Sequence, residues 1–428
     1  MIAAPLLLAL LAATPPSRAE CSPRDNRFCA EIQRIAGQPR VARALRSVQD
    51  DAARERREMI ELTGIPAPPF QEQARVRRYL AMLLEAGADS VWIDEVGNAI
   101  GLRRGTNRER RVVIEGHLDT VFPEGTDVTV KVRGDTLAAP GIGDDVRGLV
   151  AVLGVLRAIS TADVRTEADV WFVGTVGEEG LGDLRGVKHL FRAGAPTIDA
   201  YIALEPGGDR VTIGGIGSHR YRVTFRGPGG HSWGAFGTAS PIHALGRAIA
   251  LFDRVGESLT GDGPRASYNV GRIGGGTSVN SIAFEAWMEV DMRSENPAKL
   301  QTLDRALHAA VGRAVEDENA GAHRGEPVTV DFEQVGDRPS GAADPGTPLV
   351  LRTAAVIQHF GGTPSFGNGS TNANLPFSLG RPAVTIGAGG VSGDSHALTE
   401  WWSDDDGTAY RAVQHALLLV VAEAGLGE

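Results

Sequence analysis

The order of apolar and polar positions divides the chain into helices and short strands. Residues 41–63 mix apolar and charged positions at helical spacing before a proline-rich stretch at 65–69, so they predict an amphipathic helix. Residues 71–85 predict a second helix that ends near Gly87. Short β-rich runs then alternate with helical stretches such as 146–159; the runs are 91–93, 99–102, 112–114, 170–173, 201–204 and 383–386. This alternation predicts an α/β fold with a mostly parallel sheet covered on both faces.

Residues from about 217 to 332 have a different pattern and predict a separate α+β unit. Ser240-Pro241 suits the N-cap and first turn of a helix. The elements expected around it are strands at 221–225, 266–273, 281–292 and 328–332 and a second helix at about 299–316. The order β-α-β-β-α-β is typical of a ferredoxin-like domain. We therefore predict a catalytic domain in two parts, residues 30–216 and 333–428, interrupted by an insert at 217–332.

Composition supports a two-domain protein that does not bind nucleic acid. The 428 residues exceed what one hydrophobic core usually organises. The formal net charge is -10, from 43 basic and 53 acidic side chains, and the arginines form no basic patch along the sequence.

The N-terminus predicts export. The apolar run 2–13 is too short to span a bilayer and is followed by small residues around Ala19, so residues 1–19 are expected to be a cleaved signal peptide. Because the run has no preceding Lys or Arg, a misassigned start and an uncleaved anchor are alternatives. Cys21 and Cys29 are the only cysteines, and in an oxidising compartment they would form a local disulfide; two free thiols are the alternative. We expect a secreted or periplasmic protein with no membrane association after cleavage.

Polar side chains follow four of the predicted strands where each apolar run ends. In chain order they are His117, Glu178-Glu179, Glu205 and His396. Because open α/β sheets bind ligands at the carboxyl ends of their strands, we expect these side chains to share one rim. Imidazole and carboxylate groups suit a pair of zinc ions, and manganese or cobalt could occupy the same ligands.

Asp144 and Asp119 complete this predicted centre. Asp144 follows Gly141-Ile142-Gly143, which allows close backbone approach, and its carboxylate could bridge two ions. Asp119, two residues after His117, is placed to accept from the imidazole. Of the adjacent Glu178 and Glu179, one can face an ion while the other takes and returns a proton. Each residue alone has an ordinary structural interpretation, but their combination favours a metal centre.

The motifs together resemble the cocatalytic dizinc peptidase family that includes glutamate carboxypeptidase, peptidase T, acetylornithine deacetylase and succinyl-diaminopimelate desuccinylase. The resemblance covers about residues 55–425 and rests on Gly116–Pro123, Gly141–Asp145, Gly177–Gly180, Glu205–Gly207, Gly229–Ser232 and Ser395-His396.

The resemblance implies a role for each residue of the centre. His117 and Glu205 would bind one zinc, Glu179 and His396 the other, and Asp144 would bridge them. Asp119 would orient His117, Glu178 would be the general base, and the Asp144-Asp145 peptide bond would be cis.

In the insert, the resemblance implies substrate-binding residues and a homodimer. His231 matches a residue that binds substrate and stabilises the oxyanion, often across a dimer, so the insert is expected to serve as a dimerisation and lid domain. Asn280 and Arg293 lie near positions that hold the substrate's carboxylate, for which a guanidinium offers a two-pronged donor. For Arg293, an ordinary ion pair on an exposed strand is the alternative.

We therefore expect a metallo-exopeptidase or amidohydrolase, of carboxypeptidase or tripeptidase type, that cleaves amide bonds in small peptides or N-acyl amino acids. One alternative is a deacetylase of a non-peptide amide. Another is a non-catalytic peptide- or metal-binding protein of the same fold. The presence of Glu178 argues against the last, because a binding protein has little need for a free carboxylate beside a ligand carboxylate.

Overall fold

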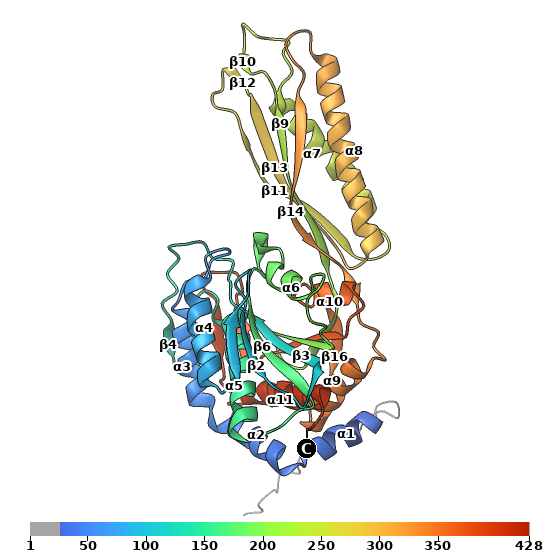
Figure 1. Ribbon diagram of the computed structural model, residues 1–428. Helices are drawn as coiled ribbons and strands as arrows, with labels where there is room; N and C mark the ends of the chain where they lie inside the picture. Colours follow the sequence, from blue (N-terminus) through green and yellow to red (C-terminus); the bar gives the residue numbers. More distant parts are fainter. Residues whose placement is uncertain (1–25, 428) are drawn as a thin grey trace, which may run out of the picture.

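A computed structural model describes residues 26–427, which form the two-part domain predicted to be catalytic, called the catalytic part below, and an insert that projects from it (Figure 1). The predicted signal peptide and Cys21 lie outside the described residues. The catalytic part is built on a nine-stranded sheet with the order β1-β2-β6-β3-β7-β17-β8-β15, and β16 pairs with β8. The bounds are β1 Ser90–Ile93, β2 Ala99–Arg103, β3 Asn107–His117, β6 Ala168–Thr175, β7 Ala200–Glu205, β8 Arg210–Gly215, β15 Gly341–Ala342, β16 Ser365–Gly369 and β17 Ala383–Gly387.

The central strands are parallel, as predicted, and antiparallel pairs make the sheet mixed overall. Strands β6, β3, β7 and β17 are neighbours that run in the same direction, with Val112 opposite both Val170 and Ala200. Strand β1 pairs with β2 in the antiparallel sense. The short link between them explains this, because a parallel pair needs a crossover of a dozen or more residues.

Helices cover both faces of this sheet (Figure 1). On one face, α5 and α11 pack in the larger hydrophobic core, to which α1 to α4 and α9 also contribute. On the other face, α6 and α10 cover a smaller core that includes Val187, Leu190 and Phe377. The bounds are α1 Asn26–Ala36, α2 Pro39–Asp50, α3 Ala52–Thr63, α4 Gln73–Glu85, α5 Gly148–Thr161, α6 Arg185–Leu190, α9 Pro348–His359, α10 Asn374–Ser378 and α11 Tyr410–Ala424.

The single helix predicted for residues 41–63 is wrong, because the chain forms α2 and α3 there. The break lies at Asp51, whose N–H donates to the carbonyl of Val48 while its own carbonyl accepts from Arg54 and Glu55. These local hydrogen bonds end one helix and begin the next without a proline or glycine, so the apolar spacing continues across the break.

The insert is a four-stranded antiparallel sheet, β11-β13-β9-β14, with two long helices on one face. Alternate side chains of β13, such as Met288 and Met292, are buried with Leu303 and Leu307 of α8. The elements follow the predicted β-α-β-β-α-β order, and β14 extends beyond residue 332. They are β9 Gly217–Arg226, α7 Pro241–Thr260, β11 Ala266–Gly275, β13 Glu285–Ser294, α8 Pro297–Gly321 and β14 Thr329–Arg338.

Two small sheets carry loops that matter for the site. At the tip of the insert farthest from the catalytic sheet, β10 (Gly230–His231) pairs with β12 (Ser281–Ile282) (Figure 1). In the catalytic part, β18 (Val391–Gly393), β19 (Trp401–Ser403), β5 (Thr136–Ala138) and β4 (Lys131–Arg133) form the second small sheet. None of the helices in the described part of the chain has the length and apolar character that a membrane span requires.

Candidate metal centre

The five predicted metal ligands lie together at the rim of the parallel strands. His117 ends β3 and Glu205 ends β7, while Glu179 follows β6. Asp144 lies in the turn Ile142–Arg147 (η1) before α5, and His396 lies in the loop between β18 and β19. Ligand atoms lie within 4.8 Å of one another in the group His117, Asp144 and Glu205, and likewise in the group Asp144, Glu179 and His396. Asp144 belongs to both groups and is therefore placed as the bridge.

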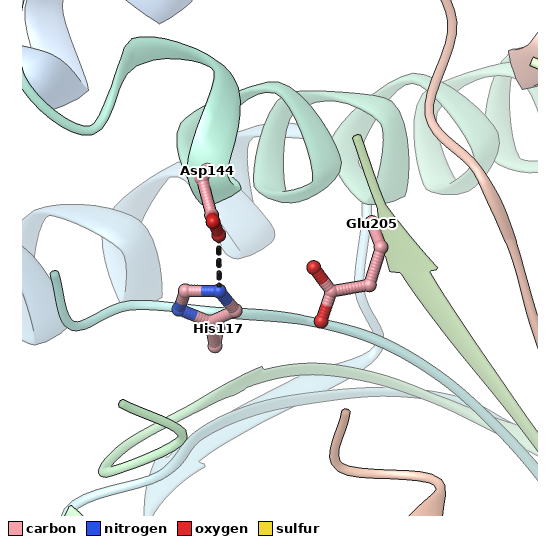
Figure 2. A group of neighbouring side chains, drawn as sticks. All are labelled: His117, Asp144 and Glu205. Carbon is pink, nitrogen blue, oxygen red and sulfur yellow. Dashed lines mark hydrogen bonds and ion pairs between the residues drawn. The ribbon is translucent and has the colours of Figure 1, made fainter. Parts of the chain in front are cut away.

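Contacts within the cluster are direct. His117 Nε2 lies 2.9 Å from Asp144 Oδ1, and Figure 2 shows the Glu205 carboxylate reaching toward the same point from the end of β7. His396 Nε2 lies 2.8 Å from Glu179 Oε1 and 3.3 Å from Asp144 Oδ2. A donor set of imidazole nitrogens and carboxylate oxygens, arranged as two groups with one shared member, fits two divalent cations.

The carboxylates of the cluster are crowded, so the site favours the binding of positive charge. Hydrogen bonds to Asp144 and Glu179 raise the pKa of His396 to about 10. Burial alone would raise the pKa of Asp144, but hydrogen bonds from His117 and His396 outweigh it and hold that pKa below its usual value. Burial, together with neighbouring carboxylates, raises the pKa of Glu205 well above its usual value. A bound cation would relieve the same repulsion.

Asp119 acts on the site differently from the prediction. His117 Nδ1 is 3.0 Å from the main-chain carbonyl of Asp119 and 3.8 Å from its carboxylate. The carboxylate instead accepts the backbone N–H groups of Glu178 and Glu179, at 3.0 and 2.8 Å. Two N–H donors therefore occupy the side chain, which positions the Glu178-Glu179 turn while the carbonyl orients the imidazole.

Glu178 is buried and paired with Arg338, a residue that the sequence analysis missed. Arg338 Nη1 donates to Glu178 Oε1 at 2.9 Å and to Ser370 Oγ at 3.1 Å, and its other terminal nitrogen donates to the main-chain carbonyl of Glu178. Burial raises the pKa of Glu178 to about 7, with Arg338 opposing the shift and Glu179 adding to it. A carboxyl group with a pKa near neutrality is suited to accept and return a proton.

Arg293, which was predicted to hold the substrate's carboxylate, lies beside the metal cluster together with Arg220. Both line a cavity of about 280 Å³, and the cavity is also lined by Asp144, Glu178, Glu179, Glu205 and His396. Asp291 holds both arginines, with its two oxygens 2.8 Å from Arg220 Nε and 2.7 Å from Arg293 Nε. Two guanidinium groups share one carboxylate, so this side of the cavity keeps a net positive charge. The ion pair that was the alternative for Arg293 is therefore present alongside its position in the site.

His231 and Asn280 lie together but away from this cavity. Both are exposed at the tip of the insert, where His231 belongs to β10 and Asn280 directly precedes β12 (Figure 1). The main-chain carbonyl of Asn280 accepts from Ser232 at 2.9 Å, and His231 Nδ1 accepts the N–H groups of Trp233 and Gly234, each at 3.2 Å. Within one chain, the described structure does not bring these two residues to the metal centre.

The turn that carries Asp144 has the expected backbone. The Asp144-Asp145 peptide bond is cis, which confirms that prediction. Gly141 adopts φ 79°, a conformation that favours glycine. The Asp145 carboxylate accepts the backbone N–H of His117 at 2.9 Å, which ties the turn to the end of β3.

Metal-dependent hydrolases are the class that this fold and site define. Residues 113–419 match the model of peptidase family M20/M25/M40, and the chain belongs to this family. Members of this family depend on metal ions. The family match and the relatives named as hydrolases support the assignment of this chain as a metal-dependent hydrolase of amide bonds.

Individual relatives are distant. The chain is 24% identical over 337 residues to the succinyl-diaminopimelate desuccinylase of Corynebacterium glutamicum, covering 77% of this chain and 87% of that protein. It is 34% identical over 159 residues to a Thermococcus kodakarensis protein provisionally named a LysW-lysine/LysW-ornithine hydrolase, and this match spans 37% of the chain and only 41% of that protein. The crystal structure of aminopeptidase PepT from Bacillus cereus superposes with a TM-score of 0.67 at 21% identity, over 87% of this chain and 99% of that one. It shares the fold, including the insert.

Proposed function

We propose that the protein is a two-zinc hydrolase that cleaves amide bonds in small peptides or N-acyl amino acids with a free carboxylate. The observation that carries this proposal is the pair of ligand groups sharing Asp144, with Glu178 and Arg293 beside them in one cavity. The small volume of that cavity, about 280 Å³, favours small substrates.

The side chains have distinct roles in this proposal. The five ligands would hold two cations, which would supply polarisation of the scissile carbonyl and a more acidic water. Glu178 takes the proton of the attacking water and returns it to the leaving amine, since its pKa lies near neutrality. Asp119 holds Glu178 in place by accepting its backbone N–H, and Arg338 does so by donating to its carboxylate.

Arg293 and Arg220 bind the substrate's carboxylate in this proposal. Their Nε atoms are held by Asp291, and Arg220 Nη1 also donates to the carbonyl of Gly180 at 2.7 Å, which leaves the other terminal N–H groups for a ligand. A carboxylate placed between them would neutralise the net positive charge of the three residues. This arrangement favours substrates with a free carboxyl terminus over those with a blocked one.

We further propose a homodimer in which a second copy supplies His231. The tip of the insert exposes large apolar side chains beside His231, with Trp233 at 88%, Phe236 at 81% and Val279 at 104% relative exposure. Exposed apolar groups of this size commonly mark an interaction surface. Mixing the inactive variants Glu178→Gln and His231→Ala should restore about a quarter of wild-type activity, as random exchange between symmetric dimers predicts. No recovery after proven exchange would contradict the shared site.

The main test is hydrolysis of dipeptides, tripeptides and N-acetyl amino acids, each with a C-terminal amide counterpart. Zinc-loaded wild type should cleave members with a free carboxylate, chelation should abolish turnover, and Glu178→Gln should bind the same substrates without cleaving them. A protein that only binds peptides would show affinity and no turnover in the wild type. Cleavage that is indifferent to the carboxylate would instead favour a deacetylase of another amide.

Export through residues 1–19 is also part of the proposal, because the segment has the apolar run and small residues of a signal peptide. N-terminal sequencing of the protein after expression with its leader would test this, and an intact Met1 would contradict it.

A further inference from the structure

A buried glutamate connects two of the segments that carry proposed metal ligands. Glu400 is 1% exposed and lies four residues after His396, directly before β19. Its Oε1 accepts the backbone N–H groups of Gly143 and Asp144, each at 2.9 Å, and its Oε2 accepts that of Gly141 at 2.8 Å. One carboxylate therefore collects three N–H donors from the turn that presents Asp144.

The main chain of Glu400 is also held by a hydrogen bond. Its carbonyl accepts the N–H of Ala139 at 3.0 Å, which extends the pairing of β19 with β5. The loop before it is short, and His396 adopts φ 68° within it. Such a backbone conformation is uncommon for a residue other than glycine, so it depends on how the ends of the loop are held.

The glycines of the turn leave room for this contact. A Cβ added at Gly143 would lie 3.3 Å from Glu400 Oε1 and 3.0 Å from the Cβ of Ser392. The turn and the base of the His396 loop are thus in close contact, with the Glu400 carboxylate between them. A shift of either segment would lengthen these hydrogen bonds.

We propose that Glu400 is a positioning residue that sets the spacing of Asp144 and His396 and so assembles the ligand group Asp144, Glu179 and His396. This inference rests on the proposed two-cation function. A carboxylate is required because both of its oxygens accept, whereas glutamine would turn one amide N–H₂ toward a backbone N–H. A buried N–H without an acceptor is costly, so the turn in the glutamine variant should move away.

The test is a titration of zinc into chelator-stripped Glu400→Gln, Glu400→Asp and wild type, with cobalt absorption spectra as a second readout. Wild type should bind two ions. In Glu400→Gln the Kd of the ion held by Asp144, Glu179 and His396 should rise roughly 10- to 100-fold, the range seen when a group that orients a metal ligand is lost. The Kd of the second ion should rise less, through Asp144 alone. The cobalt spectrum of the first ion's site should change, and Glu400→Asp, which keeps the charge, should lie between the two.

Glu423→Gln is the matched control, since it also removes a buried carboxylate from the catalytic part, but one paired with Arg352 on α9. It should lose stability in the metal-free state and keep both zinc affinities. Unchanged zinc affinities and cobalt spectra in the Glu400 variants, with two ions in wild type, would overturn this inference alone. Fewer than two ions in wild type would overturn the proposed function as well. If Glu400→Gln does not fold, Glu400→Asp decides on the same criteria.

Discussion

Replacing Arg338 with methionine should destabilise the metal-free protein in a pH-dependent way. The guanidinium lies 2.9 Å from the Glu178 carboxylate, and both side chains are 5% exposed. At that distance and an effective dielectric constant of about 20, their attraction is about 6 kcal/mol. The desolvation of both groups offsets part of this attraction, but removing one partner leaves a buried charge and typically costs about 3–5 kcal/mol.

Protonation of Glu178 limits this loss of stability and makes the loss smaller at low pH than at high pH. Burial already raises the pKa of Glu178 to about 7, above its value of about 4.5 in the unfolded chain, and loss of Arg338 should raise it further. The folded variant then binds more protons than the unfolded chain, so its stability falls as pH rises. We expect a loss of roughly 3 kcal/mol at pH 8 and a smaller loss at pH 6.

Urea unfolding in the presence of a chelator, at both pH values, measures this difference. Arg78→Met is the control, because Arg78 pairs with Glu61 and Glu85 at the surface, where such pairs contribute about 1 kcal/mol or less. If Arg338→Met is no more destabilising than Arg78→Met, or is equally destabilising at pH 6 and pH 8, the buried pair does not act as described.

Three further outcomes follow from the same contacts. Bound cations should lower the pKa of Glu178 below about 7, so kcat/KM of the wild type should decline as pH falls through a value below 7. In Arg338→Met the same decline should begin at a higher pH. An acidic limb of the pH–rate profile that is the same in both proteins would contradict this. Arg293→Gln should raise KM for N-acetyl amino acids by roughly 10- to 100-fold, as the loss of a charged hydrogen bond predicts, while C-amidated substrates change little. An equal effect on both substrate types would exclude carboxylate binding by Arg293. Burial lowers the pKa of His415 to about 4, below its unfolded value of 6.5, so wild type should lose stability as pH falls from 6.5 to 4. His415→Phe keeps the ring contact with Phe360. Between pH 6.5 and 4, its free energy of unfolding in urea should fall by up to about 3 kcal/mol less than that of the wild type. An identical pH dependence in the two proteins would refute this.

The fold could be predicted largely because its strands are short apolar runs with a clear period. The runs at 112–114, 170–173, 201–204 and 383–386 correspond to the central parallel strands β3, β6, β7 and β17. The break between α2 and α3 could not be predicted, since hydrogen bonds at Asp51 create it without a change in the apolar spacing.

Four of the five proposed metal ligands could be placed by one rule, that side chains after parallel strands meet at the same edge. Asp144 does not follow one of these strands, and it was assigned from the glycines before it and from the resemblance. Residues that support them were missed because their partners are remote in sequence. Arg338 meets Glu178 across 160 positions, and Glu400 meets Asp144 across 256. No local spacing encodes such contacts. His231 and Asn280 were assigned by resemblance alone, and in the single chain they lie at the far tip of the insert.

The central claim is that two cations occupy overlapping sites that share Asp144. A crystal structure of the zinc-loaded protein, with anomalous scattering recorded at the zinc edge, tests it most directly. We predict two peaks, one about 2.0–2.2 Å from His117, Asp144 and Glu205 and the other at the same distance from Asp144, Glu179 and His396. A single peak, or peaks that Asp144 does not contact, would contradict the claim.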